Sequence, residues 1–173
     1  MCWPEAVKAV VWLGESWGFW IQTGAFLLSA LAAIAIIFFN GKQARVRALI
    51  DILLHQKSDS ALIEATRKVL DLKSSGGNLS AHVTSDTEER RTILRVLNNQ
   101  EFLAVGVRKK AFDEDVYKQM QCSNVLRLWS AAQGFIHELR EDDKKKTLFQ
   151  DFEALATEWK KNPITKIKHF WFF

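Results

Sequence analysis

The sequence predicts an all-α protein in which a single N-terminal transmembrane helix is followed by a helical cytoplasmic domain of about five helices. Residues 16–40 contain no charged side chain. Through most of the remaining chain, apolar residues recur at the three- and four-residue spacing of an amphipathic helix. No strong strand pattern and no internal repeat interrupts them. A hydrophobic content of 48% allows the domain a core of its own.

The apolar segment over residues 18–39 reads GFWIQTGAFLLSALAAIAIIFF. As a helix it matches a hydrocarbon core of roughly 30 Å, and a lone span must be helical to satisfy its backbone groups in lipid. A cleaved signal peptide and a buried helix of a soluble protein are the alternatives. Signal peptides carry basic residues before the apolar run, whereas this flank mixes Glu5, Lys8 and Glu15. We therefore expect a retained anchor.

The basic residues Lys42, Arg45 and Arg47 follow the apolar segment and precede the first acidic residue. Because basic flanks stay in the cytoplasm, we expect the N-terminus outside and the domain inside. The same three side chains would contact anionic lipid at the membrane interface.

The extracytoplasmic segment, residues 1–17, is expected to form a short interfacial helix from Pro4 to Trp17. Trp12, Trp17 and Trp20 crowd this end, as in the aromatic belt of a membrane interface. The tryptophans could equally extend the membrane span.

Small residues recur at four-residue spacing along the same region. Such patterns let membrane helices approach closely, so a homo-oligomer formed through this face is a hypothesis. Alanine is also common in membrane helices for other reasons. The face comprises Gly14, Gly18, Ala25, Ser29 and Ala33.

The cytoplasmic domain, residues 40–162, reads as one helix after another. The first is expected to continue from the membrane helix, the second to be capped within Ser58–Ser60, and the third to be capped by Thr84, Ser85 or Asp86. A loop over 73–85 and a charged turn over 141–146 separate helices. The expected helices are 42–56, 61–72, one through Val107, 111–120, 124–139 and 147–161.

Asn98 and Glu101 lie three residues apart and share a helix face. We expect this polar pair to tie helix ends together by bonding an otherwise unpaired amide; orienting a ligand is the alternative. The acidic cluster that begins at Asp113 is expected to cap a helix rather than to bind a metal.

The sequence offers no catalytic, cofactor-binding or metal-ligating constellation. The histidines have no HExxH spacing, the glycine pair lacks the lysine of a phosphate loop, and Cys122 has no base nearby in sequence. We therefore expect a protein that is not an enzyme and needs no cofactor. The aromatic and basic tail, residues 163–173 with Trp171, would insert at a membrane interface or pack against the domain or a partner.

Two stretches carry a family resemblance: LNNQEFLAVGV over residues 97–107 and FDEDVY over 112–117. With Trp129 and Arg140 downstream, this part of the chain resembles the bacterial and prophage family catalogued as domain of unknown function 4760, over roughly residues 20–145. The resemblance implies a membrane-anchored helical domain in the bacterial inner membrane, and it supplies no catalytic residues. The family's setting in prophages and mobile elements implies interference with competing phages or modification of the host membrane.

The function expected is therefore a membrane-tethered, non-enzymatic interaction module that blocks infection by other phages (superinfection exclusion). Its partners would be membrane lipid and another protein, a phage or host membrane component. The alternatives are a membrane-bound effector that binds nucleic acid or assembles a catalytic site from scattered residues, and a small membrane-active toxin. Nucleic acid is the less expected partner because a net charge of +4 falls far short of a dense basic face.

Overall fold

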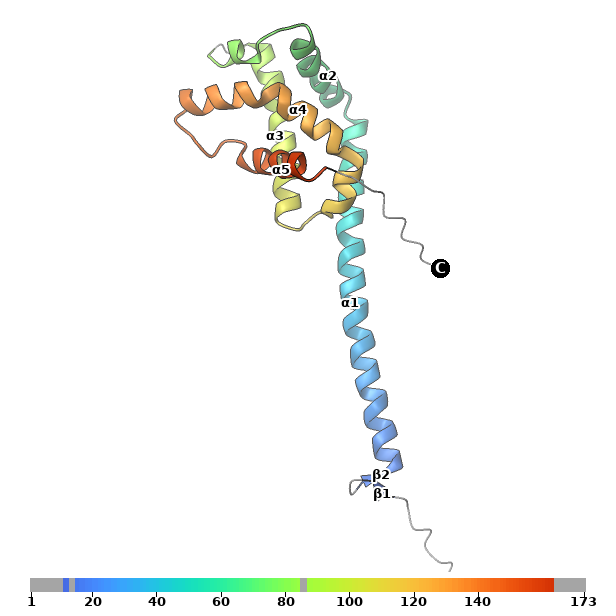
Figure 1. Cartoon of the computed structure of the whole chain (residues 1–173). Coiled ribbons are helices and arrows are strands. Elements are labelled where there is room, and N and C mark those ends of the chain that lie inside the picture. The colour runs from blue at the N-terminus through green and yellow to red at the C-terminus, as the bar shows by residue number, and fades with distance from the viewer. Residues whose placement is uncertain (1–10, 13–14, 85–86, 164–173) are drawn as a thin grey trace, which may run out of the picture. The chain divides into compact units, whose positions relative to one another are not determined.

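The computed structural model describes residues 11–12, 15–84 and 87–163. Within this part the chain forms five α-helices, one 3₁₀ helix and two strands of two residues each (Figure 1). The all-α prediction is confirmed. The chain divides into two compact units, Met1–Gln43 and Ala44–Phe173. This boundary falls a few residues beyond the predicted end of the apolar segment.

In the first unit, strand β1 (Val11–Trp12) pairs antiparallel with β2 (Glu15–Ser16). The predicted interfacial helix is therefore wrong at residues 11–12 and 15–16, whereas residues 4–10 and 13–14 lie outside the described residues. Val11 and Trp12 are β-branched and aromatic residues, the types that favour strands.

Helix α1 (Trp17–Ser58) follows without a break. The expectation that a helix continues from the apolar segment through residues 42–56 is confirmed. Gly41 lies in open space within it. In the second unit, the last turns of α1 bury Leu49 and Leu53 in the core.

Helix α2 (Ser60–Ser74) begins where a serine and aspartate cluster predicted a cap. The Asp59 carboxylate accepts a hydrogen bond of 3.0 Å from the Leu62 amide. The predicted loop after α2 contains the short 3₁₀ helix η1 (Leu79–His82), which packs against α4.

Helix α3 (Glu88–Arg108) begins after Thr87, whose hydroxyl accepts from the Arg90 amide. The prediction that Thr84, Ser85 or Asp86 caps this helix is therefore wrong. Two acidic residues, Glu88 and Glu89, lie in its first turn. This position at the positive end of the helix suits carboxylates, and a backbone hydrogen bond there lowers the pKa of Glu89.

Helix α4 (Glu114–Asp142) is one helix where the sequence predicted two, over 111–120 and 124–139. The polar residues Gln121, Ser123 and Asn124 indicated a break, but none is a glycine or proline, and flanking Val125 and half-buried Cys122 pack against the core. The predicted cap at Asp113 is confirmed, because its carboxylate accepts from the Val116 amide.

Helix α5 (Gln150–Lys161) begins three residues later than predicted. Phe149 has a φ of 55°, in the left-handed region, and its buried ring packs in the core. The carbonyl of Leu148 accepts two hydrogen bonds from the Arg140 guanidinium, of 2.9 and 2.8 Å. These interactions hold the chain in a turn before α5.

The core of the second unit lies where α3 packs against α2 and α5, and α4 packs against α5 (Figure 1). Trp159, Tyr117, Phe135 and Phe152 are its largest fully buried side chains. The Tyr117 and Trp159 rings lie 5.4 Å apart, and the Trp159 indole donates to the Glu114 carboxylate over 3.0 Å. Burial raises the pKa of Tyr117.

Candidate functional site

The apolar part of α1 is the first candidate site. Within the described residues, one helix is long and apolar enough to cross a membrane, and none of its most apolar window is buried. Residues 18–39 extend about 33 Å at 1.5 Å per residue, close to the thickness of a hydrocarbon core. Soluble proteins rarely expose continuous apolar surface on this scale. Its large exposed side chains are Phe19, Ile21, Phe26, Leu27, Leu28, Leu31, Ile34, Ile36, Ile37, Phe38 and Phe39.

The tryptophans predicted at the membrane interface lie near the start of this helix. Trp17 is 57% exposed and Trp20 is 36% exposed, with the Trp20 ring edge-on to Phe19 at 5.7 Å. Trp12 belongs to β1, and its side chain lies outside the described part. The predicted interface residue Trp171 and its tail also lie outside the described residues.

The three basic residues after the apolar segment differ in their surroundings. Lys42 and Arg47 are exposed, as an interface role requires. Arg45 is half-buried, and its Nε atom has no hydrogen-bond partner within the described part of the chain. Arg45 therefore contributes to packing in the second unit as well as to the charge of this region.

The predicted oligomer face is exposed at each of its described positions: Gly18, Ala25, Ser29 and Ala33. Gly14 lies outside the described residues. The Ser29 hydroxyl donates to the carbonyl of Ala25 over 2.9 Å, so its hydrogen-bonding capacity is met within the helix. The homo-oligomer stays a prediction.

The predicted polar pair is separated by the structure. The Glu101 carboxylate accepts hydrogen bonds from the amides of Asp151, at 3.2 Å, and Phe152, at 2.8 Å. Glu101 therefore caps α5 from another helix, the kind of bond expected of it. Asn98 is exposed and makes no side-chain hydrogen bond within the described residues.

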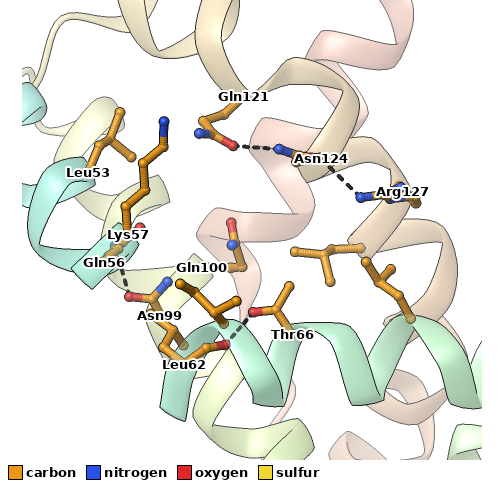
Figure 2. Close-up of a pocket in the computed structure, with 13 residues that line it drawn as sticks. Leu53, Gln56, Lys57, Leu62, Thr66, Asn99, Gln100, Gln121, Asn124 and Arg127 are labelled. Atoms are coloured by element: carbon orange, nitrogen blue, oxygen red, sulfur yellow. Dashed lines mark hydrogen bonds between the residues drawn. The ribbon is translucent and has the colours of Figure 1, made fainter. Parts of the chain in front are cut away.

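The second candidate site is a pocket of about 230 Å³ lined by four helices. The sequence did not predict it, because its residues are scattered over more than 70 positions. Its only sequence signals are the amide-rich stretch Asn98–Gln100 in α3 and the helical spacing of Gln121 and Asn124 in α4. Figure 2 shows polar side chains gathered around it, with Leu53 and Leu62 among the labelled lining residues. The lining residues are Leu53, Gln56, Lys57, Leu62, Ile63, Thr66, Leu70, Asn99, Gln100, Gln121, Asn124, Arg127 and Leu128.

Hydrogen bonds fix several of these polar groups. The Gln56 amide donates to Asn99 Oδ1 over 2.9 Å and joins α1 to α3. Along α4, Arg127 donates to Asn124 Oδ1 over 3.2 Å, and the Asn124 amide donates to Gln121 Oε1 over 2.9 Å (Figure 2). The pocket is therefore held by ordered side chains from separate helices.

Among the described residues, no group of three or more histidine, cysteine or carboxylate side chains is placed to hold a metal ion. Cys122 is a free, half-buried thiol. These observations identify no reacting constellation in the described part of the chain.

Comparison with protein families decides the chain's membership. The family model for a domain of unknown function, DUF4760, matches residues 22–159. This chain belongs to the DUF4760 family. No curated protein and no solved structure matches it. The DUF4760 match begins inside the apolar part of α1 and ends at Trp159 in α5, so the family domain includes both the apolar helix and the helical unit.

The residues that carried the DUF4760 resemblance join α3, α4 and α5. Glu101 caps α5, and Asp113 caps α4. At Gly106 a β-carbon would overlap the Phe112 ring, so a side chain there would displace an aromatic core residue. The carbonyl of Gly106 also accepts a hydrogen bond from the Phe112 amide. The motif therefore sets the turn between α3 and α4 and the position of α5.

Proposed function

We propose that this DUF4760 protein is a membrane-anchored interaction module, in which α1 spans the bacterial inner membrane and holds residues 44–173 at its cytoplasmic face. One observation carries the proposal: the most apolar window of α1 has none of its residues buried. Exposing this surface to water would cost about 25 cal/mol for each Å² of apolar area. A bilayer removes that cost, and α1 satisfies its own backbone hydrogen bonds.

The alternatives to an anchor have less support. A core helix of a soluble protein would bury its apolar side chains, and this window buries none. A cleaved signal peptide would lie outside the mature domain, whereas the DUF4760 match includes the apolar segment from residue 22 onward.

The orientation rests on charge. Lys42, Arg45 and Arg47 follow the apolar segment, and the opposite flank has a net negative charge from Glu5, Lys8 and Glu15. The excess of basic residues favours a cytoplasmic position for the C-terminal unit. Exposed Lys42 and Arg47 are free to meet anionic head groups, with each contributing about 1 kcal/mol.

Thiol labelling tests both anchor and orientation. The experiment uses a Cys122→Ala variant that also carries Lys160→Cys at an exposed position of α5. In this protein, Cys2 reports on the N-terminal side and position 160 reports on the domain. In intact spheroplasts, a membrane-impermeant maleimide should label Cys2 alone, and permeabilisation should add the label at position 160. The reverse pattern would overturn the orientation.

Fractionation supplies the matched control for the anchor. The full chain should stay with membranes after alkaline carbonate washing, and a variant without residues 18–39 should be soluble. A full chain that is released by carbonate would show that α1 does not span the bilayer.

We propose that the module acts on a protein at the membrane and excludes competing phages. The support is the prophage setting implied by the family, together with a domain whose described residues hold no reacting constellation. Plaque formation by a panel of phages tests it in cells that express the full chain or residues 41–173. Protection by the full chain alone would support a tethered block on infection. No protection by either form, at confirmed membrane expression and across the panel, would refute the exclusion role. Growth arrest that needs residues 18–39 would favour a membrane-active toxin.

A further inference from the structure

We propose that the four-helix pocket of the second unit is a binding site for a compact phosphate group. It has a volume of about 230 Å³, at the small end for ligand sites. Its lining mixes apolar and polar side chains from α1, α2, α3 and α4 (Figure 2). This inference is independent of the proposed anchor and of any role in phage exclusion.

The charge of the lining selects an anion. Lys57 and Arg127 line the pocket, and none of the described lining residues is acidic. Neither cation makes an ion pair within the described part of the chain, although ion pairs do form elsewhere, as between Arg140 and Glu153 at 2.7 Å. An oxyanion would receive charge-assisted hydrogen bonds from an ammonium on α1 and a guanidinium on α4.

The amide side chains add oriented donors. Gln121 and Asn99 each use their side-chain oxygen to accept an internal hydrogen bond, from Asn124 and Gln56 respectively. Their NH₂ groups are therefore the parts of these side chains left to meet a ligand. Figure 2 shows Gln121 and Lys57 toward one end of the pocket and Arg127 toward the other.

One buried acceptor distinguishes phosphate from other anions. Gln100 Oε1 is buried and has no hydrogen-bond partner in the described part of the chain, and Gln100 lines the pocket. Inorganic phosphate keeps at least one hydroxyl at neutral pH, and this group can donate to the oxygen; a phosphate monoester has such a hydroxyl when it binds as the monoanion. Sulfate has the same shape but no proton to donate at neutral pH. A site that hydrogen-bonds a hydroxyl discriminates against an analogue without one.

Occupancy would join helices that otherwise meet through few polar bonds. Lys57 lies in the last turn of α1, and Arg127 lies in the middle of α4. A bound phosphate bridges the two side chains and stabilises the folded unit by mass action.

The test uses the full chain in a neutral detergent, with inorganic phosphate and sulfate as probes at constant ionic strength. The concentration dependence of the unfolding temperature gives an apparent affinity for each anion. We expect saturable stabilisation by phosphate, with sulfate binding roughly tenfold more weakly because Gln100 Oε1 then stays unpaired. Both salts stabilise proteins generally by exclusion from the surface, so a response that is unsaturable and equal for the two anions would overturn the proposal.

Variants locate the effect. Arg127→Gln and Lys57→Gln should each weaken phosphate binding by about tenfold or more, and Lys160→Gln, on an exposed part of α5, should leave it unchanged. Arg127 and Lys57 are exposed, so neither change should prevent folding. Gln100→Leu should bring the phosphate and sulfate affinities together. Phosphate affinity that is unchanged in both cation variants would refute the site.

The source of the phosphate is a separate arm of the same experiment. Competition by glycerol 3-phosphate, without competition by vesicles that contain phosphatidic acid, a lipid phosphomonoester, would identify a soluble phosphate ester as the ligand. Competition by the vesicles would identify a lipid head group. Either result supports the site, because both ligands present the same chemical group.

Discussion

Replacing Glu101 should loosen α5 selectively, because α5 lacks a cap of its own. Its N-cap residue, Phe149, makes no side-chain cap hydrogen bond, and the Glu101 carboxylate on α3 bonds the first amides instead. Phe152 is fully buried, so water cannot readily replace the lost acceptor at its amide. Losing a helix cap costs about 1 kcal/mol and losing a bond to a charged group about 1.5–3 kcal/mol.

We therefore expect Glu101→Ala to lower the free energy of unfolding by about 2 kcal/mol, which is roughly 4–8 °C in unfolding temperature for a chain of this length. Glu101→Gln keeps one oxygen acceptor without the charge and should cost about half as much. Asn98→Ala is the matched control, one turn away on the same helix and exposed, and should change stability by less than about 0.5 kcal/mol.

The assay is thermal unfolding of the full chain in a mild detergent, followed by helical circular dichroism, with amide hydrogen exchange mapped to α5. Faster exchange should appear first in the opening turn of α5, because loss of a cap frays the helix locally. If Glu101→Ala and Asn98→Ala have equal stability, or if exchange in α5 is unchanged, the capping argument is wrong.

Three further predictions concern backbone conformation and one buried phenol. Gly106→Ala should lower the free energy of unfolding by about 1–3 kcal/mol, because the new methyl group overpacks against the Phe112 ring. Gly41→Ala, in open space, should raise it by about 0.5–1 kcal/mol through helix propensity. Chemical unfolding of the two variants checks both signs. Lys144 is exposed and has a φ of 51°, in the left-handed region that favours glycine, so Lys144→Gly should raise the free energy of unfolding by about 0.5 kcal/mol. Lys145→Gly, at an ordinary φ, should lower it. Thermal unfolding of both variants checks the two signs. Tyr117 is the single tyrosine of the sequence, and burial raises its pKa above the ordinary value of 10.0. The folded state is therefore fully stable below pH 10.0 and loses stability as the pH rises above it, because the unfolded chain ionises first. Tyrosinate absorbance that appears near pH 10.0 while helicity is intact would contradict the raised pKa.

Helical periodicity predicted the helices well because most of their apolar residues face one core. The continuous α1 and the caps at Asp59 and Asp113 are local features, and each follows from residues within one turn. Local reasoning failed where distant groups decide the structure. The start of α5 depends on Arg140, which bonds the carbonyl of Leu148 and pairs with a carboxylate in the first turn of α5.

The pocket was not predicted because its lining residues come from helices that are distant in sequence. It also explains why one helix, α4, was predicted as two. The predicted break between the helices over 111–120 and 124–139 falls beside Gln121 and Asn124. In the structure they line a polar pocket and hydrogen-bond each other, so they sit within a continuous helix. A polar interruption in an amphipathic helix is therefore compatible with a site as well as with a turn.

The DUF4760 motif combines two kinds of residue in adjacent positions. Glu101 and Gly106 determine how α3 meets its neighbours, through a cap and a close ring contact. Asn99 and Gln100 line the pocket and contribute nothing to that junction. Because consecutive helical residues point in different directions, two turns of α3 can serve both. Substitutions at Glu101 and Gly106 should therefore change stability without a selective effect on anion binding, and Gln100→Leu should change anion preference with little loss of stability. A pocket effect of Gln100→Leu that vanishes after correction for stability would mean that the motif specifies the fold alone.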